Sequence, residues 1–197
     1  MLQSEKGGAE MIIRPAAAAD APAMAEIYAP YVQNTAVSFE EVPPDASELA
    51  ARMEKLTAQY PWLCAVENGE VIGYAYASPQ FSRAAFRWCA DLSVYLRPDC
   101  RRRGVGSALC RALLTVLTAQ GYRSVWAVVT GDNEASLRVH TAIGFERVAE
   151  LPETGYKLGA WHSVVFLRYV LSPGEPEGEP RPWHELDMPA LLREAGV

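Results

Sequence analysis

The sequence lacks the features that mark membrane, exported and zinc-binding proteins. No run of residues approaches the roughly 18 consecutive apolar positions that a transmembrane helix needs, and the polar start has no apolar signal-peptide core. The four cysteines form no Cys-x-x-Cys pair, and the three histidines lie far apart. These absences favour a cytoplasmic protein with neither a disulfide framework nor a bound metal.

The chain also lacks an excess of positive charge. Its 18 Lys and Arg residues are outnumbered by 24 Asp and Glu residues, which gives a formal net charge of −6 at pH 7. Binding to nucleic acid usually needs a basic surface, so we expect no nucleic-acid partner. With 197 residues, half of them hydrophobic, the chain is long enough for one domain with a sizeable core.

Composition divides the chain into three segments. Residues 1–10 are polar and contain glycine, which predicts a loose leader. Residues 11–171 carry the hydrophobic patterns of a folded domain. Residues 172–197 are rich in proline and end in an apolar stretch, Met188 to Leu192, which predicts an appended tail with a short helix.

Within residues 11–171 the hydrophobic period changes repeatedly between that of a strand and that of a helix. Asp20, and later Asp45 or Ser47, can cap the first two helices, and Asn68-Gly69 predicts a hairpin because both turn residues tolerate positive φ. The predicted strands are 11–14, 62–66, 71–77, 86–96, 124–129, 147–151 and 163–170. The order β-α-α-β-β-β-α-β-α-β-β predicts an α/β fold with a mixed sheet.

The most informative segment follows the strand predicted at 86–96 and opens a helix. It carries Arg101, Arg102, Arg103, Gly104 and Gly106. Unpaired N–H groups at a helix start and the helix dipole attract phosphate, and glycines let a ligand approach the backbone. Both the Gly-Lys-Ser/Thr of a P-loop and the third glycine of the dinucleotide fingerprint are missing. The segment predicts a different pyrophosphate cradle; a glycine-capped helix beside solvated arginines is the alternative.

Two motifs resemble signatures of the GNAT superfamily of N-acetyltransferases. Arg101-x-x-Gly104-x-Gly106 resembles its acetyl-CoA motif. The segment Asn133 to Phe145 resembles its second signature, and within it Asn133, Ser136 and His140 are spaced three and four residues apart, which places them on one helix face. A buried structural histidine is the alternative interpretation of His140.

Three further segments narrow the resemblance to the phosphinothricin N-acetyltransferase family. Tyr60–Leu63, Trp88–Tyr95 and Gly159–His162 match it in order, and the similarity covers Ile12–Leu171. The resemblance implies the GNAT fold, an α/β fold with a mixed, twisted sheet of about seven strands and helices on both faces. It implies acetyl transfer from acetyl-CoA, without a metal, to the α-amino group of phosphinothricin, methionine sulfoximine, methionine sulfone or a similar small amino acid. It also implies a homodimer.

The resemblance implies roles for individual residues. Asp91 stands where the family has Glu, so its carboxylate sits one methylene further back; direct, water-mediated and structural roles all stay open. His140 stands where the superfamily often has a tyrosine acid, and Tyr95 completes the implied catalytic set. The residues implied to bind acetyl-CoA are Val94, Tyr95, Leu96, Arg101, Arg102, Arg103, Gly104, Val105, Gly106, Ser107, Asn133 and Ser136.

The substrate side follows from the chemistry of an amino acid. Its carboxylate calls for arginine as a bidentate partner, and Arg83 and Arg87 lie just before Asp91, at positions that are basic in many relatives. Phe39 can form an apolar wall. Solvated arginines and ordinary packing of Phe39 are the alternatives. Acetylation of peptide or protein amines, and a non-catalytic acetyl-CoA-binding module, remain the competing functions.

Overall fold

A computed structural model describes residues 11–197, so the predicted leader, residues 1–10, lies outside the described residues. One seven-stranded sheet has the order β1-β2-β3-β4-β5-β7-β6, and only β4 and β5 pair in parallel. The strands are β1 (Ile12–Pro15), β2 (Trp62–Glu67), β3 (Glu70–Pro79), β4 (Cys89–Leu96), β5 (Ser124–Thr130), β6 (Glu146–Lys157) and β7 (Ala160–Val170). The predicted α/β fold with a mixed sheet is confirmed.

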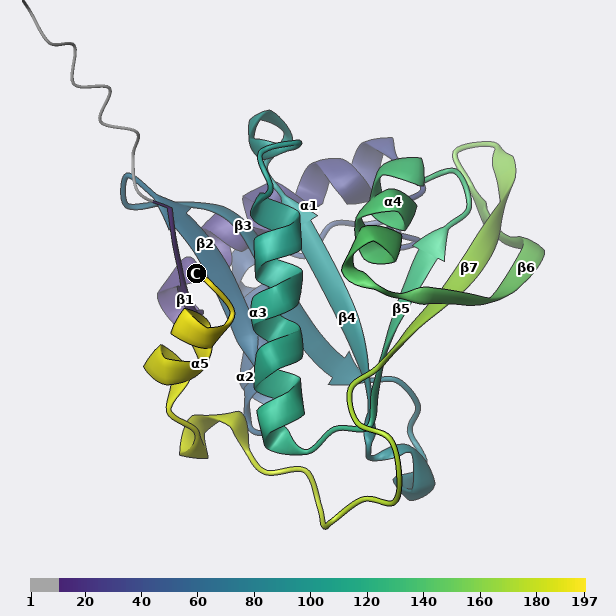
Figure 1. The fold of residues 1–197 in the computed structure, drawn as a ribbon. Coiled ribbons are helices and arrows are strands. Elements are labelled where there is room, and N and C mark those ends of the chain that lie inside the picture. The colour runs from purple at the N-terminus through teal and green to yellow at the C-terminus, as the bar shows by residue number, and fades with distance from the viewer. Residues whose placement is uncertain (1–10) are drawn as a thin grey trace, which may run out of the picture.

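Helices cover both faces of the sheet (Figure 1). They are α1 (Ala21–Asn34), α2 (Ala46–Thr57), α3 (Val105–Gln120), α4 (Glu134–Ile143) and α5 (Met188–Glu194). On one face α3 buries Leu109, Leu113 and Leu117, the apolar row expected from helical spacing, against the central strands. On the other face α1 and α2 enclose a second core with strands β2 and β3. Among residues 11–197 no helix combines the length and apolar character needed to cross a membrane.

Helix capping agrees with the prediction at α2 and differs at α1. The Glu48 N–H donates to the Asp45 carboxylate at 2.9 Å, which caps α2. Asp20 gives α1 no side-chain cap. Its carboxylate instead accepts from the Arg14 guanidinium at 2.7 and 2.8 Å and from the Ala17 N–H at 2.8 Å. The predicted Asp20 cap is therefore wrong, because a partly buried ion pair takes both carboxylate oxygens.

The predicted bounds of three strands are also wrong. The strand expected from Phe86 begins only at Cys89, because Ala84–Phe86 forms a 3₁₀ turn. The last two strands are longer than expected and form one hairpin, β6–β7, that turns at Leu158-Gly159 with φ of 52° and 80°. This long hairpin projects beyond α4 (Figure 1).

The segment 172–197 lies on the domain rather than apart from it. Met188 and Leu192 of α5 are buried in the same core as α3. The Gln120 side-chain amide donates to the carbonyls of Gln59 at 2.8 Å and Arg181 at 2.7 Å. The segment runs below the end of α3, and α5 then packs beside α3 and β1 (Figure 1).

Candidate active site

The parallel strands β4 and β5 separate after a short paired stretch. Residues Cys89–Asp91 pair with Ser124–Trp126 of β5, whereas β4 continues to Leu96 and is paired with β3 from Ala90 to Leu96. Beyond Asp91 the edge of β4 that faces β5 has no strand beside it, and the two strands diverge (Figure 1). This gap offers backbone groups of β4 to a ligand.

Strand alternation determines which backbone groups face the gap. The Arg97 N–H donates to the Ile72 carbonyl of β3 at 2.9 Å, whereas the Leu96 N–H donates to the Tyr31 hydroxyl at 3.2 Å. That hydroxyl donates in turn to the Leu96 carbonyl at 2.7 Å. Because N–H groups two residues apart point the same way along a strand, the Val94 N–H faces the gap. It is suitably directed to donate to an acyl oxygen.

Helix α3 begins with unpaired donors beside this gap. The first intrahelical bond runs from the Ala108 N–H to the Gly104 carbonyl at 3.0 Å, so the N–H groups of Val105, Gly106 and Ser107 have no helical acceptor. Gly104, in the N-cap position with φ of 84°, has no side chain to cap them. These donors and the positive end of the 16-residue helix α3 can attract an anionic group such as a diphosphate.

The Leu96 side chain of β4 lies close to both β3 and the first turn of α3. A Cβ placed on Gly106 would lie 3.3 Å from Leu96 Cδ1, and a Cβ placed on Gly73 would lie 2.4 Å from Leu96 Cδ2. Two glycines therefore make room for this side chain, one on β3 and one in the first turn of α3. Their absent side chains fix how closely β4 approaches the start of α3.

The three arginines before α3 have different surroundings. Arg103 pairs with Glu67 and also lies near the Cys100 thiol. The Arg101 guanidinium carbon lies 5.1 Å from the centre of the Tyr31 ring, within cation–π range. Within residues 11–197 neither Arg101 nor Arg102 forms an ion pair, so these two carry the uncompensated positive charge beside the cradle.

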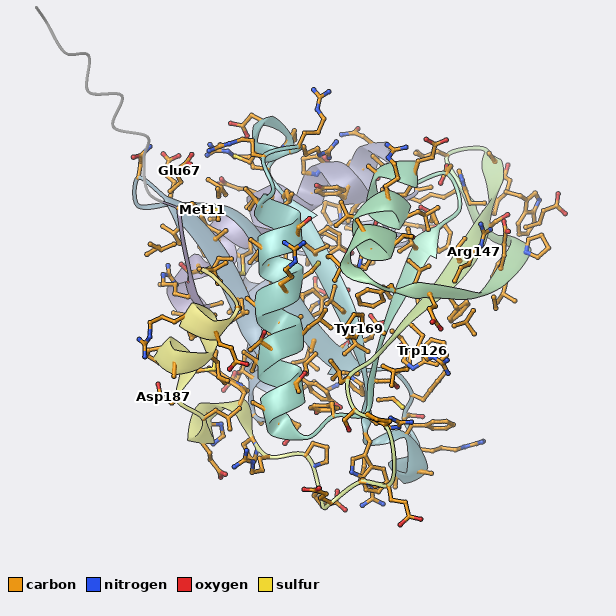
Figure 2. The ribbon with its side chains drawn as sticks, viewed as in Figure 1. Met11, Glu67, Trp126, Arg147, Tyr169 and Asp187 are labelled. Carbon is orange, nitrogen blue, oxygen red and sulfur yellow. The ribbon has the colours of Figure 1, made fainter. Side chains whose placement is uncertain are left out.

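Asp91 lies where the two strands part. It is paired in register with Ser78 on β3 and with Trp126 on β5, which is labelled in Figure 2. Its side chain is largely enclosed, and its Oδ1 has no hydrogen-bond partner in the described chain. Burial raises the pKa of Asp91 to about 7. A carboxylate that gains and loses a proton near neutral pH suits general-base chemistry.

Tyr95 lies on the same strand face as Asp91 but inside an aromatic cluster. Its ring centre is 4.6 Å from that of Tyr28, 5.3 Å from that of Tyr31 and 5.5 Å from that of Tyr74. Burial raises the pKa of Tyr95 well above its ordinary value, which keeps the phenol neutral. The cluster joins α1 to the strand that borders the gap.

The predicted helix motif comes together on α4. Asn133 caps the helix by accepting from the Ser136 N–H at 3.2 Å, and His140 Nδ1 lies 2.9 Å from the Ser136 carbonyl. That contact requires a proton on Nδ1, so the neutral ring has an unprotonated Nε2, which is buried and has no partner among residues 11–197. Burial lowers the pKa of His140. The ring packs edge-on against Phe145, with the centres 5.0 Å apart.

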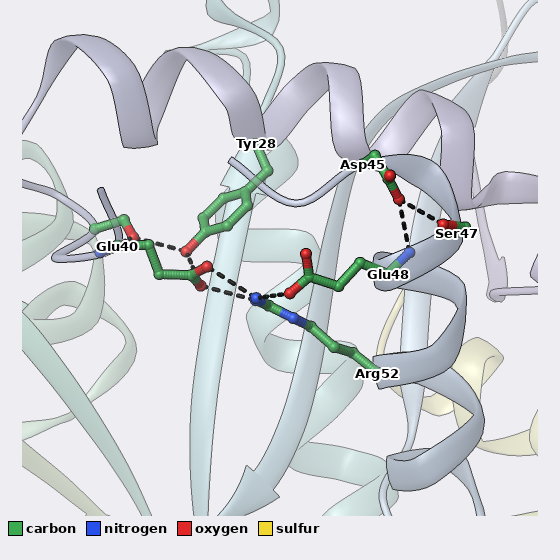
Figure 3. A network of polar contacts seen from close by, with 7 residues as sticks. Tyr28, Glu40, Asp45, Ser47, Glu48 and Arg52 are labelled. Carbon is green, nitrogen blue, oxygen red and sulfur yellow. Dashed lines mark hydrogen bonds and ion pairs between the residues drawn. The ribbon is translucent and has the colours of Figure 1, made fainter. Parts of the chain in front are cut away.

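The loop between α1 and α2 is held by charged groups that the sequence did not reveal. Glu40 accepts from the Arg52 guanidinium at 2.8 and 2.9 Å and from the Tyr28 hydroxyl at 2.9 Å (Figure 3). The Lys157 ammonium of β6 donates to the carbonyls of Val32 and Ser38 at 2.5 and 2.6 Å. These partners are distant in sequence, so no local pattern could identify them.

In the sequence Phe39 lies between Ser38, whose carbonyl binds Lys157, and Glu40, which pairs with Arg52. A Cβ placed on Gly155 of β6 would lie 2.3 Å from Phe39 Cζ, so the glycine makes room for this ring. The Phe39 ring centre is 6.3 Å from that of His162, which contacts Asp132 at 3.1 Å. With 41% of its surface exposed, Phe39 lies outside the buried core.

The two arginines predicted to bind the substrate carboxylate, Arg83 and Arg87, have different surroundings. Arg87 donates from Nε to the Ala84 carbonyl at 2.8 Å and pairs with Glu179 of the C-terminal segment. Its guanidinium carbon lies 4.8 Å from the centre of the Trp88 ring. Arg83 precedes the 3₁₀ turn and is exposed, and its side chain forms no hydrogen bond or ion pair within residues 11–197.

Comparisons with known proteins agree with this geometry. The model of the acetyltransferase (GNAT) family matches residues 22–145. Phosphinothricin N-acetyltransferase of Streptomyces viridochromogenes is 38% identical over 170 residues, 86% of this chain and 93% of its own. An L-methionine sulfoximine/L-methionine sulfone acetyltransferase of Pseudomonas aeruginosa is 36% identical over 163 residues, 82% of this chain and 95% of its own.

A solved structure is similar in three dimensions. It is a GNAT superfamily phosphinothricin acetyltransferase from Sinorhizobium meliloti in complex with acetyl-CoA. The TM-score is 0.83 at 38% sequence identity, and the match covers 87% of this chain and 96% of that one.

Proposed function

Because the chain belongs to the acetyltransferase (GNAT) family, we propose that it transfers the acetyl group of acetyl-CoA to the α-amino group of a small amino acid. Analogues of the phosphinothricin, methionine sulfoximine and methionine sulfone type are the proposed substrates, by analogy with its relatives. The observation that carries the proposal is Asp91, an enclosed carboxylate without a partner at the point where β4 leaves β5.

The residues around the gap fit acetyl-CoA. The free N–H groups of Val105, Gly106 and Ser107 would hold its diphosphate, with Arg101 and Arg102 nearby. The Val94 N–H would donate to the acyl oxygen, which gains negative charge in the transition state. When bound, acetyl-CoA supplies an activated thioester. The protein supplies position and charge stabilisation, and no covalent enzyme intermediate is needed.

Proton transfer completes the mechanism. An α-amine with a pKa of ~7.7–8.0 is largely protonated at pH 7 and must lose a proton before it can attack. Asp91, with a pKa raised to about 7, is placed to accept that proton directly or through a water molecule. His140 Nε2 is the proposed proton carrier for the departing thiolate. It is unprotonated in the neutral ring, so it would first take up a proton that the amine releases, and its lowered pKa would then favour passing that proton to the thiolate.

A panel of amines tests the proposal. Thiol release from acetyl-CoA is measured with phosphinothricin, methionine sulfoximine, methionine sulfone, aromatic amino acids and short peptides. Turnover with the first three supports an amino-acid acetyltransferase. Turnover with peptides alone favours peptide or protein acetylation. Tight acetyl-CoA binding without turnover of any amine favours a non-catalytic module.

Arg87 provides a prediction about substrate selection. Replacing it with Ala should raise the KM of the free amino acid about tenfold, because a charge-assisted hydrogen bond contributes about 1.5–3 kcal/mol. The KM of the amino-acid amide and the acetyl-CoA KM should stay nearly unchanged. Arg83→Ala, measured in parallel, shows which arginine binds the carboxylate. A wild-type enzyme that already prefers the amide would remove this role from both.

Exposed apolar side chains support a homodimer. Val128, Val148 and Val170 on strands β5, β6 and β7 are 47%, 47% and 44% exposed. Val128 lies between buried neighbours, so it projects from the sheet face opposite α3 and α4. If two copies meet on this face, light scattering should give a dimer mass for the wild type and a monomer mass for Val128→Lys. A wild-type monomer would contradict the dimer.

The proposed location is the cytoplasm. The four cysteines are unpaired, which suits a reducing compartment.

A further inference from the structure

The C-terminal segment brings a carboxylate to the loop that precedes β4. Glu179 pairs with Arg87, and the next residue along the loop, Trp88, donates from its indole N–H to the Gly178 carbonyl at 2.7 Å. Arg87 is one of the two arginines that the proposed function offers to the carboxylate of the substrate. Its partner in the structure is therefore a carboxylate of the chain itself.

The segment is anchored independently of this ion pair. The Arg181 backbone N–H donates to the Gln120 carbonyl at 2.8 Å, and its guanidinium donates to the Ala119 carbonyl at 2.8 Å. The Trp183 indole donates to the Thr57 carbonyl at 2.8 Å, and α5 is buried beyond it. Neutralising Glu179 should therefore leave the segment in place, so that the effect of its charge can be measured separately.

The ion pair between Arg87 and Glu179 is weak enough for a substrate carboxylate to displace Glu179. The side chains of Arg87 and Glu179 are 42% and 66% exposed, so water screens their attraction. An exposed ion pair of this kind changes an equilibrium constant by up to about fivefold. A substrate carboxylate can therefore displace Glu179, at a modest loss of apparent affinity. A substrate without a carboxylate loses nothing.

We propose that Glu179 is a specificity-determining residue that competes with the carboxylate of the substrate for Arg87. The inference rests on the proposed function, because it concerns the same binding site.

The substitution Glu179→Gln tests the proposal, because it removes the charge and keeps the size. The KM of methionine sulfoximine should fall about three- to fivefold, while the KM of its carboxamide and the KM of acetyl-CoA should not change. Glu177→Gln is the matched control, since Glu177 is also exposed, lies two residues before Glu179 and forms no ion pair within residues 11–197. In an Arg87→Ala background, Glu179→Gln should have no effect.

Several results would overturn the proposal. They are an unchanged KM in Glu179→Gln, an equal fall for the acid and the amide, and the same fall in the Arg87→Ala background. If Glu177→Gln lowers the KM of methionine sulfoximine as much as Glu179→Gln does, the effect comes from the net charge of the segment, and the proposal is also overturned.

Chemical labelling of Arg87 gives a second measurement that does not depend on turnover. Phenylglyoxal should modify Arg87 faster in Glu179→Gln than in the wild type, and methionine sulfoximine should protect Arg87 more strongly in the variant. Equal rates and equal protection would overturn the proposal. If the wild type acetylates no amino acid, the proposed function fails, and the labelling still decides whether Glu179 competes for Arg87.

Discussion

Asp91→Asn should lower kcat by about 10²- to 10⁴-fold, the usual contribution of a positioned general base, and leave acetyl-CoA binding intact. Asn keeps the shape of the side chain but cannot accept the proton of the amine. Asp91→Glu restores the reach that the family's Glu has and should retain much of the activity. The measurement is kcat for one good amino-acid substrate, with the acetyl-CoA Kd from calorimetry as the binding control.

The pH dependence separates a base from a structural carboxylate. Burial raises the pKa of Asp91 to about 7, so the wild-type rate should fall as the pH drops below 7 and the carboxylate becomes protonated. This acidic limb should be missing in Asp91→Asn. His140→Gln should lose activity separately, without moving that limb. An Asn variant with wild-type kcat and an unchanged acidic limb would show that Asp91 is structural.

The raised pKa of Asp91 also predicts that the protein becomes less stable as the pH rises, whereas its activity should increase over the same range. The native state binds the Asp91 proton more tightly than the unfolded state, whose carboxyl has its ordinary pKa near 3.8. Stability of the wild type therefore falls as the pH rises from about 4 to about 7, and the loss is complete above 7. Asp91→Asn should accordingly melt above the wild type at pH 8, with a smaller difference at pH 5.

Gly106→Val should raise the acetyl-CoA KM by about tenfold or more. Its branched side chain would stand among the free N–H groups at the start of α3 and would press on Leu96, 3.3 Å from the added Cβ. Losing one charge-assisted hydrogen bond to a phosphate costs about 1.5–3 kcal/mol, and 1.4 kcal/mol corresponds to tenfold. Calorimetry with acetyl-CoA checks the binding directly.

Two further variants make the test specific. Gly106→Ala should have a smaller effect, because the flexible end of Leu96 can move by a few tenths of an ångström. Thr115→Val, more than two turns along the same helix, should leave the acetyl-CoA Kd unchanged. A folded Gly106→Val protein with wild-type affinity would show that the cradle lies elsewhere.

The sequence predicts well those features that depend on neighbouring residues. Asn68-Gly69 forms its turn with φ of 53° and 81°, and Gly104 opens α3 with the positive φ that glycine permits. Asn133 caps α4, which brings His140 onto Ser136 as the spacing indicates. In each case the signal lies within a few residues, where backbone geometry and helix periodicity determine the outcome.

Features that join distant segments could not be predicted. Lys157 binds carbonyls more than 100 residues earlier in the chain, and Arg87 pairs with Glu179, 92 residues later. Hydrophobic period reports which face of an element is buried, but it carries no information about which charged side chain lies opposite.

Leu96 lies against Gly73 and Gly106, and its side chain determines a length within the candidate site. In the proposed function this side chain spaces the N–H groups at the start of α3, the proposed phosphate donors, from the Val94 N–H, the proposed donor to the acyl oxygen. For a donor molecule tethered by its diphosphate, the length of the arm then decides whether the thioester carbonyl reaches Val94. A shortened or lengthened pantetheine arm would bind and yet place its carbonyl out of register, so selection among acyl donors begins with length.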